Sequence, residues 1–315
     1  MSQSRFSKAL VIAPSGVVTD HAALWRGVEV LTGLVGSVEV QPAVLGAYQR
    51  FAGDDMTRLA CLESLYDLAE PTLVIAARGG YGLSRLIDRI HFERLGRALA
   101  TSGSVLCGHS DISLLQLGLC HVSAPICLHG PMVCGDFGAE TPDAGMLRCF
   151  AEWLAGSVSI EWECRRASAG FSSRSGRLWG GNLTVLCSLL GTRHFPALDG
   201  GVLFIEDVNE HPYRVERMLI QLAQAGVLDR QQAVLLGQFS DWKPSPLDNG
   251  YDLPSVWEYL SSITTTPWLT NFSFGHVAMK ASLPFGVEIR LASTDTRAVL
   301  TEAPDCSPIA AKIRS

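Results

Sequence analysis

A serine lies between a predicted buried strand and a predicted apolar helix. The apolar run Ser104–Cys107 is followed by the sequence GHSDIS, in which Ser110 occupies the bend. A serine there is exposed at the edge of a sheet and meets the positive end of a helix dipole, which favours the negative charge that develops during nucleophilic attack. The residue two positions later is Ile112, so the G-x-S-x-G pattern is not met. Serine is also a preferred helix N-cap, and the local sequence alone favours that role.

A glycine-rich turn offers a second place for chemistry. The sequence ARGGYG at Ala77–Gly82 directly follows the apolar run Thr72–Ala76. Glycines adopt positive φ readily and turn their N–H groups outward, which forms a nest for an oxyanion or a carboxylate. The spacing matches neither the dinucleotide fingerprint nor the P-loop. A tight strand-to-helix turn would need the same residues, and composition does not decide between the two interpretations.

A nucleophilic serine needs a base, and the base needs an orienting acid. His276 follows Phe274 and Gly275, and His129 follows another predicted strand, so both are candidates for the base. Either histidine taken alone is more typical of a structural residue. Glu206 comes directly off an apolar strand, where an acid must be paired or functional because burying it alone is costly. Asp207 and Glu210 are the rival acids.

Composition and charge exclude several other functions. The formal net charge is -6 and no run of Lys or Arg occurs, which argues against nucleic acid or an anionic membrane surface as a partner. The sequence has no H-E-x-x-H, no C-x-x-C and no compact His/Asp cluster, so we expect no metal.

The cysteines and the N-terminus predict a cytoplasmic protein. The nine cysteines are odd in number, and several lie within apolar runs, which is typical of free thiols in a reducing compartment. The N-terminal apolar run ALVIA is too short for a signal peptide. No window reaches the roughly 18 apolar residues that span a bilayer.

The order of predicted elements indicates two domains in the 315 residues. In residues 1–156, strands alternate with helices, which predicts a doubly wound parallel sheet. The strands are Lys8–Ala13, Ser37–Val40, Thr72–Ala76, Ser104–Cys107 and Pro125–Leu128, and the helices are Ala22–Leu34, Asp54–Ala69, Ile112–Leu119 and Asp143–Leu154. Residues 157–177 are rich in Ser, Gly and Arg and are predicted to be a linker.

Residues 178–315 have a less regular pattern, which predicts a mixed, β-rich and partly barrel-like domain. Its helices are predicted at Asn182–Leu190 and Tyr213–Ala225, and its strands at Val202–Ile205, Ala233–Gln238, Val287–Leu291 and Ala298–Leu300.

Seven motifs follow one another along the chain. They are IAPSG at Ile12–Gly16, ARGGYG at Ala77–Gly82, GHSDIS at Gly108–Ser113, HGP at His129–Pro131, WGGNL at Trp179–Leu183, LFIEDVNEHPYRVERML at Leu203–Leu219 and FGH at Phe274–His276. The set resembles the LD-carboxypeptidase family of serine peptidases (group S66). Each motif alone is weak evidence. Seven in sequence order across most of the chain make the resemblance strong.

The resemblance implies a catalytic triad divided between the two domains. The serine of the family's GxSD motif corresponds to Ser110, the first acid of LxxED to Glu206 and the histidine of GH to His276. The oxyanion hole would use the backbone N–H groups of Asp111 and Gly80. The resemblance also implies a flavodoxin-like N-terminal domain, a β-rich C-terminal domain, a homodimer, and catalysis without a metal or cofactor.

The family's activity would be removal of a terminal D-alanine from a murein tetrapeptide during cell-wall recycling. Arg78 is a candidate partner for the substrate carboxylate, and an ion pair that anchors the loop is an equally good interpretation. Two alternatives stay open: a microcin-C-like hydrolase of peptidyl-nucleotide amides, and a catalytically silent peptide-binding module. The sequence departs from the family pattern at His109 and His211, outside the triad.

Overall fold

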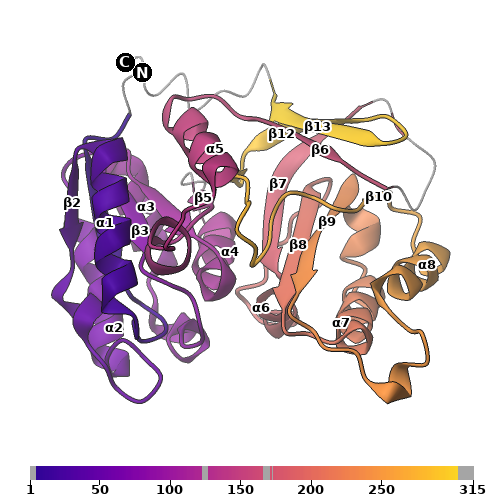
Figure 1. Cartoon of the computed structure of the whole chain (residues 1–315), viewed down its shortest axis with the longest axis horizontal. Coiled ribbons are helices and arrows are strands. Elements are labelled where there is room, and N and C mark those ends of the chain that lie inside the picture. The colour runs from indigo at the N-terminus through magenta and orange to yellow at the C-terminus, as the bar shows by residue number, and fades with distance from the viewer. Residues whose placement is uncertain (1–4, 123–126, 166–170, 172, 304–315) are drawn as a thin grey trace. The chain divides into compact units, whose positions relative to one another are not determined.

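The structure, a computed structural model, describes residues 5–122, 127–165, 171 and 173–303 of the chain. The chain forms two compact units (Figure 1). The first holds the described residues up to Ser157 together with Ala278–Gly286, and the second holds the described residues of 158–277 and 287–303. The chain therefore returns to the first unit for one short segment after it has built most of the second.

The first unit is built on a six-stranded sheet in the order β11-β5-β4-β3-β1-β2. Its strands are β1 (Lys8–Ile12), β2 (Ser37–Val40), β3 (Leu73–Ala76), β4 (Val105–Gly108), β5 (Cys127–His129) and β11 (Leu283–Phe285). Strands β1 to β5 pair in parallel, and β11 pairs antiparallel with β5. The order 2-1-3-4-5 is that of flavodoxin-like folds, as predicted. All residues of β3 and β4 are buried, as their unbroken apolar sequences require.

The described part of this unit has α-helices α1 (His21–Val35), α2 (Asp55–Glu63), α3 (Phe92–Ser102), α4 (Ser113–Val122) and α5 (Ala144–Leu154). Helices α1 to α4 lie between successive strands from β1 to β5, and α5 follows β5 and leads to the second unit. Two differences from the sequence prediction stand out. The helix expected to continue to Ala69 ends at Glu63 and is followed by a 3₁₀ turn, Ser64–Asp67. Helix α3 was not predicted, although its buried Phe92, Leu95 and Leu99 have helical spacing.

The second unit contains a seven-stranded sheet in the order β10-β9-β8-β7-β12-β13-β6. Its strands are β6 (Ser159–Glu163), β7 (Arg174–Asn182), β8 (Val202–Val208), β9 (Ala233–Ser240), β10 (Trp268–Leu269), β12 (Glu288–Ser293) and β13 (Arg297–Glu302). Strands β7 to β10 are parallel, and the remaining pairs are antiparallel. The α-helices of this unit are α6 (Leu183–Ser188), α7 (Pro212–Gln224) and α8 (Leu253–Ile263).

Hydrogen bonds join the chain at the two edges of this sheet. Arg165, just after edge strand β6, donates its backbone N–H to Oγ1 of Thr270 at 3.1 Å. Thr270, just after edge strand β10, donates its own N–H to the Arg165 carbonyl at 3.0 Å. Since the two edges meet there, the sheet is curled toward closure, and the barrel-like character predicted from sequence is confirmed.

The linker predicted over residues 157–177 is wrong for much of its length. It contains β6, which pairs antiparallel with β13, and the first residues of β7. In β6, buried Ile160 and Trp162 alternate with exposed polar residues, which is the pattern of a strand with one buried face. The Ser- and Arg-rich composition nearby obscured this short alternation. Residues 166–170 and 172 lie outside the described residues.

Candidate active site

Ser110 occupies a strained turn directly after β4. It has a φ of 64° and is the first residue of a 3₁₀ turn, Ser110–Ile112, that leads into α4. A left-handed backbone at a residue other than glycine costs free energy and is concentrated at functional sites. The residue at the N-cap position of this turn is His109, and no side chain caps it. The capping role that the local sequence favoured for Ser110 is therefore not the role that the structure gives it.

The glycine-rich turn lies against this serine. A β-carbon added at Gly79 would stand 2.7 Å from Cβ and 2.9 Å from Oγ of Ser110, and 3.4 Å from the backbone nitrogen of Asp111. Gly80 has a φ of 111°, and a β-carbon there would instead face Gly16. Gly79 must thus be glycine to let the serine approach. The assignment of the Gly80 N–H to an oxyanion hole stays a prediction.

The side chain of Asp111 joins three of the sequence motifs. Its carboxylate accepts hydrogen bonds from the hydroxyl of Ser15 and, at 3.0 Å, from the backbone N–H of Leu83. Ser15 belongs to IAPSG, and Leu83 directly follows ARGGYG. Asp111 is buried, and burial raises its pKa, which the two hydrogen bonds lower in part. The aspartate after the serine therefore holds the neighbouring loops against the serine turn.

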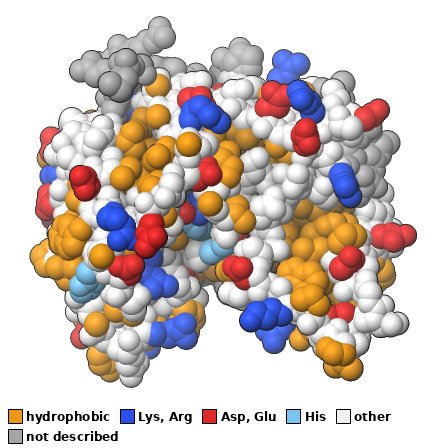
Figure 2. All heavy atoms as spheres, in the orientation of Figure 1, with side chains coloured by type: hydrophobic (Ala, Val, Ile, Leu, Met, Phe, Trp, Pro, Cys, Tyr) orange, Lys and Arg blue, Asp and Glu red, His pale blue; other side chains and the backbone are white. Residues whose placement is uncertain are grey.

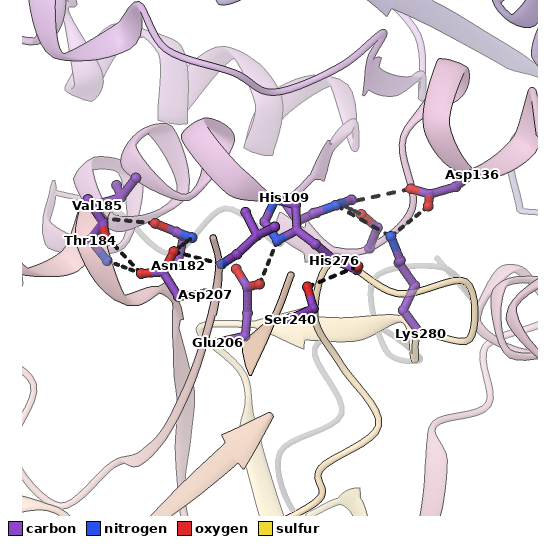
Figure 3. Close-up of polar contacts among 12 residues, drawn as sticks. His109, Asp136, Asn182, Thr184, Val185, Glu206, Asp207, Ser240, His276 and Lys280 are labelled. Atoms are coloured by element: carbon purple, nitrogen blue, oxygen red, sulfur yellow. Dashed lines mark hydrogen bonds and ion pairs between the residues drawn. The ribbon is translucent and has the colours of Figure 1, made fainter. Parts of the chain in front are cut away.

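His276 and Glu206 form a hydrogen-bonded pair within the second unit (Figure 3). Nδ1 of His276 lies 2.7 Å from Oε2 of Glu206. The His276 side chain is 20% exposed, whereas that of Glu206 is 1% exposed. The hydroxyl of Ser240 also donates to the carbonyl of His276 at 3.4 Å. A buried carboxylate thus orients an imidazole that remains accessible, which is the arrangement of a general base and its orienting acid.

A bulge in β9 lies opposite Glu206, the first of the two neighbouring acids. From Ile205 to Asp207 in β8, the paired residues of β9 advance from Leu236 to Phe239, so two β9 residues lie opposite Glu206. Glu206 turns to His276, whereas Asp207 turns toward Asn182 and Thr184 (Figure 3). Adjacent residues of a strand point to opposite faces, and bulges are frequent next to active sites.

The rival acids and the rival base have other partners. Asp207 accepts from the Asn182 amide at 2.9 Å and from Thr184 N–H and Oγ1 at 2.9 and 2.8 Å. Glu210 lies 3.7 Å from Arg214, one turn along the chain. His129 is fully buried, with Nδ1 2.6 Å from Oε1 of Gln116. Glu206 is therefore the acid that is paired with His276, and complete burial makes His129 the less accessible of the two candidate bases.

Arg78 is held by the backbone of the first unit. Its Nη1 donates to the carbonyl of Val17 at 3.0 Å, so a hydrogen bond to a carbonyl anchors this side chain. The ion pair that was one of the two interpretations of Arg78 is not formed with any of the described residues. A guanidinium carries five N–H donors, and this contact uses one of them.

Sequence reasoning missed a buried cluster beside the serine turn. Nζ of Lys280 lies 2.6 Å from Oδ1 of Asp136 and 3.4 Å from Nε2 of His109 (Figure 3). The available signal was a lysine shortly after the FGH motif in an otherwise apolar stretch. Its partner Asp136 is far away in the sequence, and no local pattern links the two.

A separate pocket of about 680 Å³ lies in the second unit, between β9 and α8. Its apolar lining comes from Leu236, Phe239, Leu253, Pro254 and Trp257. Figure 2 shows hydrophobic side chains gathered on this part of the surface. Neither Glu206 nor His276 lines it.

Two kinds of feature are absent from the described part of the chain. No group of three or more His, Cys, Asp or Glu side chains is arranged to hold a metal ion. Among the same residues, no helix has the length and apolar character needed to cross a bilayer.

Comparison with known proteins identifies the class to which this fold and these residues belong. The chain matches the LD-carboxypeptidase N-terminal domain over residues 10–130 and the C-terminal domain over residues 175–291. The murein tetrapeptide carboxypeptidase of Pseudomonas aeruginosa is 31% identical over 76% of this chain and 78% of its own length. The chain therefore belongs to the LD-carboxypeptidase family and is a serine-type carboxypeptidase.

Solved structures support the same conclusion. The crystal structure of muramoyltetrapeptide carboxypeptidase from Oxalobacter formigenes has a TM-score of 0.85 and 36% identity, and the match covers 94% of this chain and 98% of that one. The microcin C7 self-immunity protein MccF, in an inactive mutant apo state, has a TM-score of 0.82 at 21% identity over 94% of this chain and 96% of that one. At that identity the likeness to MccF is one of fold.

Proposed function

We propose that this protein hydrolyses the L,D-peptide bond to the terminal D-alanine of a murein tetrapeptide. The observation that carries the proposal is the buried Glu206 carboxylate paired at 2.7 Å with the accessible imidazole of His276. The strained turn at Ser110 supplies the nucleophile. The substrate class is supported by relatives that are 31% and 36% identical and are named as murein or muramoyl tetrapeptide carboxypeptidases.

The proposed reaction is an acyl transfer in two steps. Nε2 of His276 takes the proton from Ser110 as Oγ attacks the carbonyl carbon, and Glu206 stabilises the imidazolium through Nδ1–H. The tetrahedral intermediate collapses, and His276 gives its proton to the leaving amine of D-alanine. A water molecule then loses a proton to His276 and attacks the acyl-enzyme, and His276 returns that proton to Oγ of Ser110 as the shortened peptide leaves.

The negative oxygen of the intermediate requires hydrogen-bond donors. We assign this role to the backbone N–H groups of Asp111 and Gly80, each contributing about 3 kcal/mol to transition-state stabilisation. Asp111 is well placed to keep its own N–H fixed because its carboxylate is tied to Ser15 and Leu83. Arg78 has donors left for the substrate's terminal carboxylate, which a carboxypeptidase must recognise.

The proposal requires that His276 reach Ser110 in the active enzyme, and the Ser110→Ala variant tests it. We expect D-alanine release from purified murein tetrapeptide to fall by about 10³-fold or more, because the hydroxyl that forms the acyl-enzyme is gone. Ser188→Ala removes an exposed hydroxyl in α6 and is the matched control, expected to retain wild-type activity. Equal rates for wild type and Ser110→Ala would overturn the mechanism.

The same assay separates the alternative substrates. An aminoacyl-sulfamoyl adenylate is the probe for a microcin-C-like activity, and murein tetrapeptide is the probe for the proposed one. We expect turnover of the tetrapeptide, since the tetrapeptide carboxypeptidases are more similar in sequence than MccF is. If only the sulfamoyl adenylate is turned over, the proposed substrate is wrong, whereas the proposed triad still stands. Binding of the tetrapeptide without turnover would indicate a silent binding module.

A cytoplasmic location and a homodimer complete the proposal. The cysteines among the described residues are free thiols, which supports a reducing compartment. Sedimentation of the purified protein tests the dimer, and a single species of monomer mass at micromolar concentration would contradict it.

A further inference from the structure

Three ionisable side chains are buried together next to the serine turn of the first unit. His109 and Lys280 are each 2% exposed and Asp136 is 8% exposed. They come from three separate parts of the chain: the residue before Ser110, the π-helical turn Val133–Phe137, and the returning segment Ala278–Gly286. The mechanism proposed above uses none of them.

Lys280 and Asp136 form the ion pair of this cluster. Nζ of Lys280 lies 2.6 Å from Oδ1 of Asp136, and Oδ2 of Asp136 accepts the backbone N–H of Met132 at 2.7 Å. A buried ion pair contributes little net stability, because removing two charges from water offsets their attraction. Such a pair is therefore better explained by what it orients than by the stability it adds.

The contacts of His109 assign the position of its proton. Nδ1 lies 2.9 Å from the carbonyl oxygen of Gly130, which can only accept a hydrogen bond. Nε2 lies 3.4 Å from the ammonium of Lys280, which can only donate one. Both contacts are satisfied when the ring is neutral, with its proton on Nδ1 and its lone pair on Nε2. Other ionisable groups that face the ring include Asp136, with Oδ2 4.0 Å from Nδ1, and His129, with ring centroids 6.4 Å apart.

Lys280 lies shortly after His276 in the chain, and this position connects the buried cluster to the proposed catalytic residues. The chain leaves the second unit after Val277, directly after His276, and Lys280 lies at the start of the segment that then joins the first unit. That segment continues into β11, which pairs with β5. The Lys280–Asp136 pair thus fixes the stretch of chain that follows His276, and the same ammonium contacts the residue that precedes Ser110.

We propose that Lys280 is a positioning residue for catalysis: paired with Asp136, its ammonium group holds the neutral ring of His109 as a bridge that fixes the backbone of the Ser110 turn. The proposal rests on the role of Ser110 as the nucleophile. It deepens that role by naming what keeps the strained turn in its reactive conformation.

The test is a set of variants assayed for kcat and KM on murein tetrapeptide. Removing one partner of a buried ion pair leaves a charge unpaired and endangers folding. The first variant is therefore Lys280→Met with Asp136→Asn, in which both charges are lost together. We expect kcat to fall by about 10- to 100-fold, because a small displacement of the serine is enough for such a loss, with KM changed by no more than about twofold. Arg297→Met with Glu161→Gln removes an exposed ion pair at 3.1 Å and is the matched control, expected to keep the wild-type kcat.

His109→Asn provides a second, independent measurement, since it leaves the ion pair in place. We expect a decrease in kcat of about tenfold or more at unchanged KM. When His109→Asn is combined with Lys280→Met and Asp136→Asn, we expect little further decrease in kcat. Residues that act through the same contact have non-additive effects. A kcat within about twofold of wild type in either variant, or fully additive losses, would overturn the proposal.

Ser110→Ala separates this inference from the proposed function. If Ser110→Ala is inactive while the Lys280 and His109 variants behave as wild type, only the positioning role fails. If Ser110→Ala retains activity, the nucleophile itself is wrong, whatever the other variants do.

Discussion

Nδ1 of His276 lies 2.7 Å from Oε2 of Glu206, although 70 positions separate the two residues in the chain. The second oxygen of this carboxylate, Oε1, is buried and has no hydrogen-bond partner among the described residues. The charge of Glu206 is thus directed at one imidazole. A carboxylate with a single partner in a dry environment stabilises an imidazolium strongly when one forms, because its charge is little screened.

Glu206→Gln tests this relationship. The amide keeps the size of the side chain but cannot stabilise a positive imidazole, so we expect kcat to fall by about 10³- to 10⁴-fold with little change in KM. Glu210→Gln is the matched control, because Glu210 was the rival acid in the sequence and instead faces Arg214. Its kcat is expected within about twofold of wild type. A larger loss for Glu210→Gln than for Glu206→Gln would show that the orienting acid had been misassigned.

The sequence predicted the strands that precede the reactive residues, because those strands are short unbroken apolar runs. β3 and β4 are of this kind, and the turns after them carry the glycine-rich motif and Ser110. The sequence could not predict the β9 bulge opposite Glu206, which arises from the pairing of β8 with β9. Strand register is a property of two segments, and the side-chain pattern of one strand does not reveal it.

Side-chain contacts over long distances in the chain were equally hidden. Asp111 was expected to act through its backbone N–H, and the structure adds a carboxylate that holds Ser15 and Leu83. The ion pair of Asp136 and Lys280 spans 144 positions. In both cases each residue alone has an ordinary local context, and only the folded arrangement shows that the two groups must compensate each other's burial.

Gly79→Ala is expected to reduce activity through a steric effect. Its β-carbon would stand 2.7 Å from Cβ of Ser110, closer than two carbon atoms can approach, so the serine turn must shift. We expect kcat to fall by about 100-fold or more. Gly33→Ala is the control, since a β-carbon there meets nothing within 4 Å and the residue lies in α1. The control should retain full activity and gain up to about 1 kcal/mol of unfolding free energy. Wild-type kcat for Gly79→Ala would contradict the close approach of the glycine-rich turn.

Ser15→Ala is expected to weaken the connection between the first motif and the serine turn. Asp111 would keep the Leu83 N–H but lose the Ser15 hydroxyl while remaining buried, so we expect a loss of about 1–3 kcal/mol in unfolding free energy. Chemical denaturation measures this change. Ser37→Ala, which removes an exposed hydroxyl bonded to the carbonyl of Ser7 at 3.0 Å, should lose no more than about 0.5 kcal/mol. Equal losses of unfolding free energy in the two variants would show that the buried Ser15–Asp111 hydrogen bond contributes no more to stability than an exposed one.

Asp207→Asn is expected to change how stability depends on pH. Burial, and next the nearby charge of Glu206, raise the pKa of Asp207 from 3.8 to about 6. The folded protein therefore holds this proton more tightly than the unfolded chain does. The resulting stabilisation is fully present below pH 3.8 and is lost as the pH rises through about 6. Asparagine does not titrate, so the variant lacks this dependence.

The measurement is the difference in unfolding free energy between wild type and Asp207→Asn at pH 4 and at pH 8. We expect the wild type to lose about 2 kcal/mol relative to the variant over this interval, in addition to any pH-independent cost of replacing an acceptor of several hydrogen bonds. Asp54→Asn is the control, and its wild-type-minus-variant difference should change little between pH 4 and pH 8. The backbone N–H of Thr57 lowers the pKa of this exposed N-cap below 3.8, so the contribution of Asp54 is present above pH 3.8 and lost at more acidic pH. A wild-type-minus-variant difference for Asp207→Asn that stays constant from pH 4 to pH 8 would show that Asp207 is ionised throughout, with its hydrogen-bond donors outweighing its burial.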